Sequence, residues 1–302
     1  MYMSNKRILV VVVTYNPHEW VNRCFGSLRI SKMEVDALVV DNNSTDGGVS
    51  EIQEKYPEVR IYRSKKNLGF GQANNVGLKY AVENGYDYVY LLNQDAWILP
   101  DTLQTLVSVA EKHEEYGILS PIQLEKDEKT YESLFYKYVI CSDDLRCSLH
   151  ERIFNVEKLE EVYDISFAMA AHWLVTKRCL QTVGGFSPTF FHYGEDNNYI
   201  HRVFFHGFKL GLVPFAKAVH DSGMKSIKEL RDSAHYRIYN SELVYLSNPN
   251  TEYLIKNSIK SFIVKGIVEK DATYLRNAWL LYKNRSVIIE NRNKSKTRAP
   301  FL

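Results

Sequence analysis

Three short, mainly apolar runs in the first hundred residues each end in a cluster of polar residues. This pattern restricts the possible folds more than any other feature of the chain. Residues 8–13 lead into Thr-Tyr-Asn-Pro, residues 36–40 into Asp-Asn-Asn-Ser-Thr-Asp-Gly, and residues 88–92 into Asn-Gln-Asp. Such runs, rich in Val, Ile and Leu, are typical of strands buried in a parallel sheet, and ligands bind beyond the carboxyl ends of those strands. The pattern therefore predicts a polar crevice, and with it an enzyme or a ligand-binding protein.

Between the apolar runs, the spacing of apolar residues and the end signals predict helices. They are expected over residues 19–29, 48–55, 71–84 and 101–113, with a further strand over residues 59–63. Strands that alternate with helices in this way are typical of a sheet with helices on its faces. The chain is therefore predicted to be an α/β protein with a Rossmann-like, mostly parallel sheet.

The alternation is lost near residue 120, and residues 125–165 are expected to form an antiparallel ribbon with loops. Beyond them the expected segments are an apolar stretch, two helices, two strand pieces around a proline and two more helices. Their ranges are residues 167–175, 177–183, 195–206, 209–213, 216–220, 254–268 and 274–289. We divide the chain into a main α/β domain, residues 1–240, and a helical, basic extension, residues 241–302.

Charge is unevenly distributed along the chain. Residues 254–302 carry 11 Lys and Arg against 3 Asp and Glu, whereas residues 1–253 carry 27 against 33. Basic helices with an apolar face can lie on anionic membranes, so the extension is a candidate for peripheral membrane contact. A solvated helical face with a disordered end explains its charge equally well. The acidic body argues against nucleic-acid binding, and no window reaches the roughly 18 apolar residues that span a bilayer.

Several classes of protein are disfavoured by motifs that the chain lacks. No GxGxxG follows the first apolar run, which argues against a dinucleotide oxidoreductase, and no GxxxxGK[ST] occurs, which argues against a P-loop NTPase. The four cysteines form no CxxC pair, so a zinc site is not expected. Cys141 and Cys147 could pair, but free thiols in a reducing cytoplasm fit a chain of this length better.

Two segments carry candidate chemistry by their residue types alone. Residues 67–77 (NLGFGQANNVG) are rich in glycine and open a predicted helix, whose N–H groups can bind an anion. A simple turn explains that segment equally well. Asp95 follows a buried run, where a carboxylate is costly unless it is paired or binds a metal. A hard cation that bridges protein oxygens to a diphosphate would account for Asp95, and capping of the next turn is the alternative.

A set of motifs in a fixed order resembles glycosyltransferase family 2, and most of all its rhamnosyltransferase-type members. The motifs are VVVTYNP, VVDNNSTDG, NLGFGQANNVG, LLNQDAW, GGFSPTFFHYGEDNNYIHR and the late segment Ala218-Val219-His220. They extend over roughly residues 6–240. The resemblance implies the GT-A fold, with residues 1–240 as the catalytic domain, and a nucleotide-diphosphate sugar as the donor.

The resemblance also implies where the donor nucleotide lies, namely against the polar strand ends and the glycine-rich segment. The residues implied to contact it are Thr14, Tyr15 and Asn16 at the base, Asp41 and Asn43 at the base or ribose, and Asn67 and Gly69 along the nucleotide-sugar.

The segment Asn93-Gln94-Asp95 is similar to the family's DxD motif. Asp95 is therefore implied to bind Mn²⁺ or Mg²⁺ through the diphosphate. Asn93 stands in place of the first aspartate, as in the rhamnosyltransferase-like branch. An amide is a weaker metal ligand, so Asn93 is expected to contact ribose or a water ligand. His220 is implied to be a further metal or phosphate ligand.

Glu195 and Asp196 match the family's ED motif, in which a carboxylate is the general base. Asp196 is implied to be the base, and Glu195 to orient it or to bind the acceptor. Negative charge at a helix N-terminus would explain both residues equally well. Asn198 replaces the family's usual second aspartate. His172 and Trp173 fall where such enzymes line the acceptor site, and a core position is the alternative for the tryptophan.

The function predicted from these motifs is inverting, metal-dependent transfer of a sugar to a glycan or lipid-linked acceptor in cell-surface polysaccharide synthesis. Rhamnose from a dTDP donor is the first candidate, and UDP-linked hexoses remain open. The enzyme is expected in the cytoplasm or at its membrane surface. The alternatives are a catalytically silent nucleotide-sugar-binding protein of a glycan assembly complex and a nucleotidyltransferase. The presence of both Asp95 and Asp196 favours an active glycosyltransferase.

Overall fold

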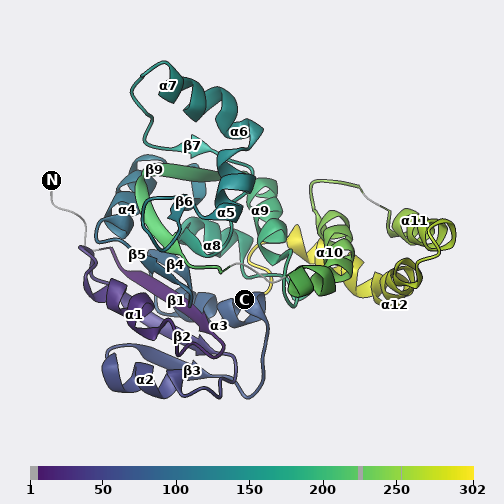
Figure 1. Ribbon diagram of the computed structural model, residues 1–302, viewed down its shortest axis with the longest axis horizontal. Helices are drawn as coiled ribbons and strands as arrows, with labels where there is room; N and C mark the ends of the chain where they lie inside the picture. Colours follow the sequence, from purple (N-terminus) through teal and green to yellow (C-terminus); the bar gives the residue numbers. More distant parts are fainter. Residues whose placement is uncertain (1–5, 224–226, 253) are drawn as a thin grey trace.

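The first half of the chain builds the parallel half of the central sheet. The computed structural model describes residues 6–223, 227–252 and 254–302. In it, β1 (Ile8–Thr14), β2 (Asp36–Asp41), β3 (Arg60–Arg63) and β4 (Tyr88–Asn93) lie in the order β3-β2-β1-β4, and all neighbours run parallel. The connections contain α1 (Val21–Arg29), α2 (Gly48–Lys55) and α3 (Phe70–Glu83). The predicted alternation of strands and helices is confirmed here (Figure 1).

The second half of the sheet is mixed, so the prediction of a mostly parallel sheet holds only for the first half. The order continues from β4 through β8, β6 and β9 to β5, and β7 pairs with β9. β8 runs antiparallel to both β4 and β6, while β6 and β9 are parallel. These strands are β5 (Ala96–Ile98), β6 (Tyr116–Leu124), β7 (Tyr163–Asp164), β8 (His172–Thr176) and β9 (Lys209–His220).

The two strand pieces expected around Pro214 are one continuous strand, β9. Its register against β6 jumps between Pro121 and Ile122, which pair with Val213 and Lys217. The extra residues of β9 form a bulge, and this bulge accommodates a proline that has no N–H to donate to the ladder.

Residues 8–13 of β1 are all apolar, as suits a strand with both faces of its sheet covered. Leu9 and Val11 pack into a core with α3, α8 (Lys177–Val183) and α9 (Glu195–Phe205). Ile8, Val10 and Val12 pack on the other face with α1 and α4 (Thr102–Lys112). Alternate residues of a strand point to opposite faces, so every position of β1 is buried except Val13, which is half-buried at the pocket.

The antiparallel ribbon predicted within residues 125–165 is wrong. The segment holds short helices and π-helical turns, and its β-structure is limited to β7 and one bridge between Leu124 and Tyr131 in the described residues. Phe135, Val139 and Ile140 are spaced for a helix and are buried against the sheet core. The elements are α5 (Ser133–Phe135), η1 (Tyr136–Ile140), α6 (Asp143–Leu145), η2 (Arg146–His150) and α7 (Glu151–Phe154).

Three further helices form a C-terminal arm, α10 (Ile227–Ser247), α11 (Ile255–Val268) and α12 (Ala272–Ser295) (Figure 1). The predicted domain boundary after residue 240 falls inside α10, and the division into two domains stays a prediction. The chain end returns to the body, because the Ala299 amide donates to the Thr182 carbonyl at 2.8 Å and the Gly185 amide to the Pro300 carbonyl at 2.9 Å. This docked end contradicts the alternative of a disordered basic end.

No helix in the described part of the chain combines the length and the apolar character that crossing a bilayer requires.

Candidate active site

The polar strand ends meet as the sequence predicts. Thr14 pairs with Asp41 across β1 and β2, and Val13 pairs with Asn93 across β1 and β4, so three strands end side by side. A pocket of about 330 Å³ opens beyond these ends. Its lining residues are Val13, Tyr15, Asn42, Asn67, Gly69, Phe70, Asn93, Gln94, Asp95, Phe191 and His192. The pocket therefore joins the strand ends to the glycine-rich segment and to the loop before α9.

Asp41 lies buried at the end of β2, where its turn holds it in place. Its Oδ1 accepts from the Ser44 amide at 3.1 Å and from the Ser44 hydroxyl, and Thr14 Oγ1 lies 3.5 Å away. The Thr14 side chain is fully buried behind this carboxylate. We correct the prediction that Thr14 contacts a nucleotide, because a side chain without exposed surface can only support Asp41.

Hydrogen bonds between loops fix the rim of the pocket. Asn16, at a φ of 53°, accepts from the Thr45 amide through Oδ1 at 2.9 Å, and its own amide donates to Ser44 Oγ at 2.9 Å. The Tyr15 amide donates to Gln94 Oε1 at 2.7 Å, and Gln94 Nε2 donates back to the Tyr15 carbonyl at 3.1 Å. The loop after β1 is thereby tied to the ends of both neighbouring strands. Asn43, at a φ of 69°, is exposed at the same rim.

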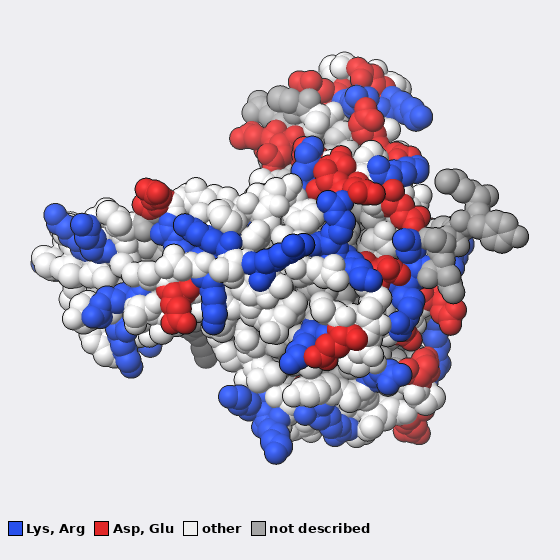
Figure 2. All heavy atoms as spheres, turned by 180° about the vertical axis from the view of Figure 1, so that it is seen from behind, with Lys and Arg blue, Asp and Glu red and all other residues white. Residues whose placement is uncertain are grey.

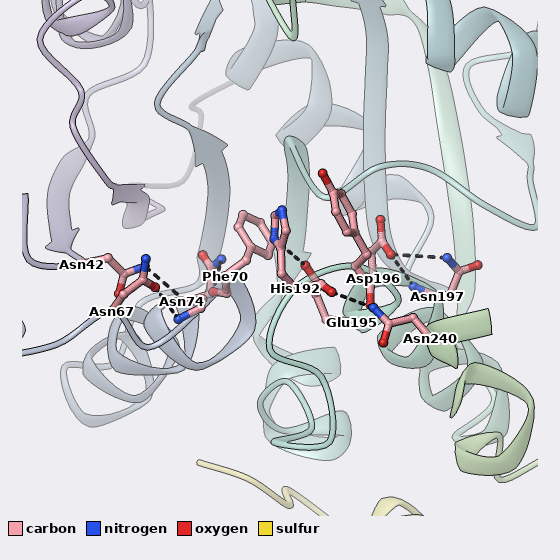
Figure 3. A network of polar contacts seen from close by, with 11 residues as sticks. Asn42, Asn67, Phe70, Asn74, His192, Glu195, Asp196, Asn197 and Asn240 are labelled. Atoms are coloured by element: carbon pink, nitrogen blue, oxygen red, sulfur yellow. Dashed lines mark hydrogen bonds and ion pairs between the residues drawn. The ribbon is translucent and has the colours of Figure 1, made fainter. Parts of the chain in front are cut away.

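Asn42 has a role that sequence reasoning missed. Its buried side chain donates from Nδ2 to the Gly69 carbonyl at 3.3 Å and accepts from the Leu68 amide at 3.0 Å. Asn67 Oδ1 in turn accepts from the Gly69 amide at 2.8 Å. The β2 end and the glycine-rich segment are therefore clamped together (Figure 3). Asn42 stands among six other polar residues or glycine in its segment, and nothing in the sequence indicates which of them points inward.

Gly69 is required by close packing at this clamp. Its φ is +78°, and a Cβ atom there would lie 2.1 Å from the carbonyl oxygen of Phe191. The Phe70 amide also donates to that carbonyl, at 3.3 Å. Asn75, one turn into α3, accepts from the Phe186 amide at 2.6 Å and donates to the Phe186 carbonyl at 2.9 Å. Much of the NLGFGQANNVG segment thus positions the loop that leads to α9.

Asp95 and His220 lie together at the pocket, on segments 125 residues apart. His220 Nε2 is 3.7 Å from Asp95 Oδ1 and 3.5 Å from Asn93 Nδ2. Burial raises the pKa of Asp95, while His220 opposes the increase. Asn93 Oδ1 and His220 Nδ1 are buried and have no hydrogen-bond partner among the described residues.

A divalent cation fits this group of side chains. A carboxylate, an amide oxygen and an imidazole nitrogen are ligands that Mn²⁺ accepts. Two such atoms, Asn93 Oδ1 and His220 Nδ1, are buried without a hydrogen-bond partner among the described residues. Within the described residues no three His, Cys, Asp or Glu side chains come close enough to form a complete metal site. The remaining ligands would therefore come from the donor and from water.

Glu132 is a second residue that sequence reasoning missed. It is fully buried, and it accepts from the Ser222 hydroxyl at 2.8 Å and from the Phe135 amide at 2.6 Å. Its negative charge contributes to the raised pKa of Asp95. Glu132 therefore links the segment after β9 to the start of α5, and it lies close enough to Asp95 to affect its pKa. The residues around Glu132 match no motif, so the sequence does not indicate that this glutamate is buried near the site.

Glu195 and Asp196 are the first two residues of α9, where they place two carboxyl groups side by side (Figure 3). Glu195 is 6% exposed, its Oε1 is 4.0 Å from His192 Nδ1, and its Oε2 has no hydrogen-bond partner in the described residues. Burial, followed by the charge of Asp196, raises the pKa of Glu195 to about 8. The pKa of Asp196 is also raised by burial, but this side chain accepts from the amide and from Nδ2 of Asn197 at 2.8 and 3.3 Å.

The turn before α9 sets the position of Glu195 and Asp196. Tyr193 and Gly194 have φ values of 65° and 95°, and positive φ at a non-glycine residue is uncommon. Asn240 on α10 donates to the carbonyls of His192 and Tyr193 at 2.8 and 3.0 Å. The arm therefore supports the turn that presents the two carboxyl groups (Figure 3). Asn240 lies 45 residues beyond the ED motif, and no local pattern predicts its contact.

The prediction that His172 and Trp173 line an acceptor site is not supported, because neither side chain has exposed surface. His172 accepts from the Tyr90 hydroxyl through Nδ1 at 2.8 Å and donates to the Val219 carbonyl at 2.9 Å. Burial, with a smaller contribution from His220, lowers its pKa to about 3. Trp173 stacks on Phe186 with ring centres 6.3 Å apart. Both residues belong to the core beneath the site.

Comparisons with known proteins agree with this geometry. A model of glycosyl transferase family 2 matches residues 9–183. The dTDP-rhamnosyl transferase RfbF of Shigella flexneri is 26% identical over 224 residues, which are 74% of this chain and 72% of the relative. An N-acetylglucosaminyl-diphospho-decaprenol L-rhamnosyltransferase of Mycobacterium tuberculosis is 27% identical over 229 residues, 70% of this chain and 75% of the relative.

A solved structure supports the fold. The mannosyltransferase PcManGT from Pyrobaculum calidifontis, in complex with GDP-Man and Mn²⁺, superposes with a TM-score of 0.57 at 16% identity, over 93% of this chain and 75% of that one. The mixed sheet with its flanking helices is accordingly the GT-A fold. Since the family model also covers more than half of the chain, the protein belongs to glycosyltransferase family 2.

Proposed function

We propose that this glycosyltransferase is an inverting, metal-dependent enzyme that moves a sugar from a nucleotide-diphosphate donor to a glycan or lipid-linked acceptor. One observation carries the proposal. A single pocket joins Asp95 to the nucleotide-side residues Tyr15 and Asn42, and its wall includes His192, which contacts Glu195. Donor, cation and acid–base residues would thus face one another across a space of small-molecule size.

The residues that would hold the cation are Asp95, His220 and the Oδ1 atom of Asn93. When bound, the cation would offset the negative charge that grows on the departing diphosphate. Asn93 thereby receives a wider role than the ribose contact expected from the sequence, because its Oδ1 is buried and unpartnered. Asp41, buried beside the base side of the pocket, is proposed to accept hydrogen bonds from the base or ribose.

Asp196 is the proposed general base, and Glu195 the residue that keeps it oriented. Two hydrogen bonds from Asn197 stabilise the charged form of Asp196, while Oε2 of Glu195 has no hydrogen-bond partner among the described residues. The proton shared by the pair is therefore expected on Glu195 at neutral pH. An ionised Asp196 can then accept the proton of the attacking hydroxyl.

The names of the relatives suggest which donor and acceptor to test first. The names of the two curated relatives specify a dTDP-rhamnosyl donor in one case and a diphospho-decaprenol acceptor in the other. We therefore propose dTDP-rhamnose as the first donor to test, a UDP-hexose as the second, and a lipid-linked sugar made in cell-surface polysaccharide synthesis as the acceptor. The enzyme would act in the cytoplasm, which agrees with the free thiol of Cys141.

Thermal stabilisation by a panel of nucleotide-sugars, with and without Mn²⁺, tests this function. We expect one dTDP- or UDP-sugar to raise the melting temperature only when Mn²⁺ is present, and we expect Asp95→Asn to abolish the effect. Glu54→Gln, which changes an exposed carboxylate of α2 away from the pocket, is the matched control. Equal stabilisation after EDTA treatment would refute the metal role. Stabilisation without any release of nucleoside diphosphate would indicate the catalytically silent alternative.

A further inference from the structure

The hairpin formed by α11 and α12 exposes large apolar side chains that are not part of the hydrophobic core. On α11, Val264, Ile267 and Val268 follow one stripe, and Ile267 and Val268 are 66% and 74% exposed. On α12, Trp279 and Tyr282 are 57% and 56% exposed. Scattered apolar residues on a surface are normal, whereas neighbouring ones on two packed helices indicate an interaction surface.

The hairpin itself is held together by other residues. Phe262 and Gly266 of α11 face α12, where a Cβ atom on Gly266 would lie 2.7 Å from the Leu275 side chain. Ala278 and Leu281 of α12 are buried in the same cluster. The exposed stripes therefore remain outside a well-packed pair of helices, and substitution there should not unfold it.

Basic groups surround the exposed apolar residues. Lys283 lies over the ring of Trp279 at 5.1 Å, Arg285 over Tyr282 at 4.1 Å, and Lys265 over Tyr274 at 5.8 Å. In Figure 2 the arm, on the left, shows blue side chains on a mainly white surface and few red ones. Aromatic rings beside lysine and arginine, which can bury their stems and keep their charges in water, are typical of the membrane interface.

The same geometry excludes the last residues of the chain as the binding element. Ile288, Asn291 and Ser295 of α12 are buried, and Pro300 is bonded to Gly185 of the body. Part of the basic C-terminal segment, which the sequence suggested as a membrane-binding element, is therefore packed against the rest of the protein. The exposed apolar surface lies earlier in the chain, at hairpin residues up to Tyr282.

We propose that the α11–α12 hairpin, through Ile267, Val268, Trp279 and Tyr282, docks the protein on an anionic lipid bilayer. We choose an anionic bilayer as the binding partner because its negative charge is complementary to the positive charge of the hairpin. Residues 255–285, which include α11 and the exposed part of α12, carry 7 basic against 2 acidic groups, so the hairpin is attracted to negative headgroups. Two copies of this hairpin would instead bring like charges together. Membrane docking does not depend on the proposed function. Only its biological purpose does, because docking would hold the enzyme beside the proposed lipid-linked acceptor.

Vesicle flotation with the full chain tests the docking surface without any substrate. The vesicles are phosphatidylcholine alone or with about one third phosphatidylglycerol, at low and at high salt. The first variant is Ile267→Glu/Val268→Glu, and the second is Lys256→Glu/Lys260→Glu, which reverses two positive charges and leaves the apolar stripe intact. The matched control is Ile30→Glu/Phe215→Glu, because these residues are 60% and 58% exposed on the body.

We expect the wild type to float with the anionic vesicles, more weakly at high salt, and scarcely with the neutral ones. Each hairpin variant should lose at least about tenfold in partitioning, since one basic residue near an anionic surface contributes about fivefold. The control should bind like the wild type, and melting temperatures should show all variants folded. Unchanged flotation of the hairpin variants, or equal binding to neutral vesicles, would overturn the proposal. Sedimentation of the wild type as a dimer that the variants break, without vesicle binding, would assign the surface to a second copy instead.

Discussion

Replacing Glu195 with glutamine is expected to stabilise the protein at alkaline pH and to leave its stability nearly unchanged at acidic pH. Glu195 is 6% exposed, and its Oε2 has no partner among the described residues. Burial and then the charge of Asp196 raise its pKa from 4.5 to about 8. An ionised Glu195 is therefore unfavourable in the folded state, and a glutamine cannot ionise.

The sign of the effect follows from proton binding. Between pH 4.5 and about 8 the folded protein retains a proton that the unfolded chain releases. The free energy of unfolding of the wild type therefore falls as the pH rises through this window. The change in pKa from 4.5 to about 8 corresponds to at most about 5 kcal/mol. We expect about 2–5 kcal/mol, because Asp196 takes part in the same titration.

Urea unfolding at about pH 5, 7 and 9 measures this difference. The variant should match the wild type at the lowest pH and exceed it increasingly at the higher ones. The matched control is Glu54→Gln, which changes an exposed glutamate of α2 and should shift stability little at every pH. A difference between Glu195→Gln and the wild type that does not vary with pH would refute the assignment of a buried, protonated Glu195.

Three further substitutions test the walls of the pocket. Asn42→Ala removes both hydrogen bonds to the glycine-rich segment, so denaturant unfolding should show a loss of about 1–3 kcal/mol; an unchanged midpoint would contradict the clamp. Gly69→Ala places a methyl group 2.1 Å from the Phe191 carbonyl oxygen and should weaken nucleotide binding by at least about tenfold in calorimetry. Gly85→Ala, at a similar φ in open space, should not weaken it. Asp41→Ala should weaken binding of the bare nucleotide by about 1–3 kcal/mol, and normal nucleotide affinity with lost turnover would place Asp41 elsewhere.

The sequence predicts the parallel half of the fold because the signals there are local. An apolar run followed by polar residues identifies the end of a strand, and parallel neighbours bring such ends together, as Thr14, Asp41 and Asn93 show. The antiparallel insertion of β8 between β4 and β6 depends on contacts between distant segments. No local periodicity reports the direction of a strand, so this half of the sheet could not be predicted.

The same distinction applies to the site. Asp95, Glu195 and Asp196 could be proposed from the sequence because their motifs are short and ordered along the chain, and their roles stay predictions. Asn42 and Asn240 were missed because their partners, Gly69 and the turn before α9, lie 27 and 47 or more residues away. His172 was misread because its two partners, Tyr90 and Val219, come from other strands and turn a candidate ligand into a satisfied core residue.

Turnover and nucleotide affinity, measured together for Asp196→Asn and Glu195→Gln, test the proposed chemistry most directly. Release of nucleoside diphosphate from the stabilising donor, with acceptor or by slow hydrolysis, gives the rate, and calorimetry gives the affinity. Asp196→Asn should bind nucleotide like the wild type and lose about 10²–10⁴ in rate, because a general base acts only in the transition state. Glu195→Gln should lose less. An active Asp196→Asn beside an inactive Glu195→Gln would contradict the assignment and make Glu195 the base.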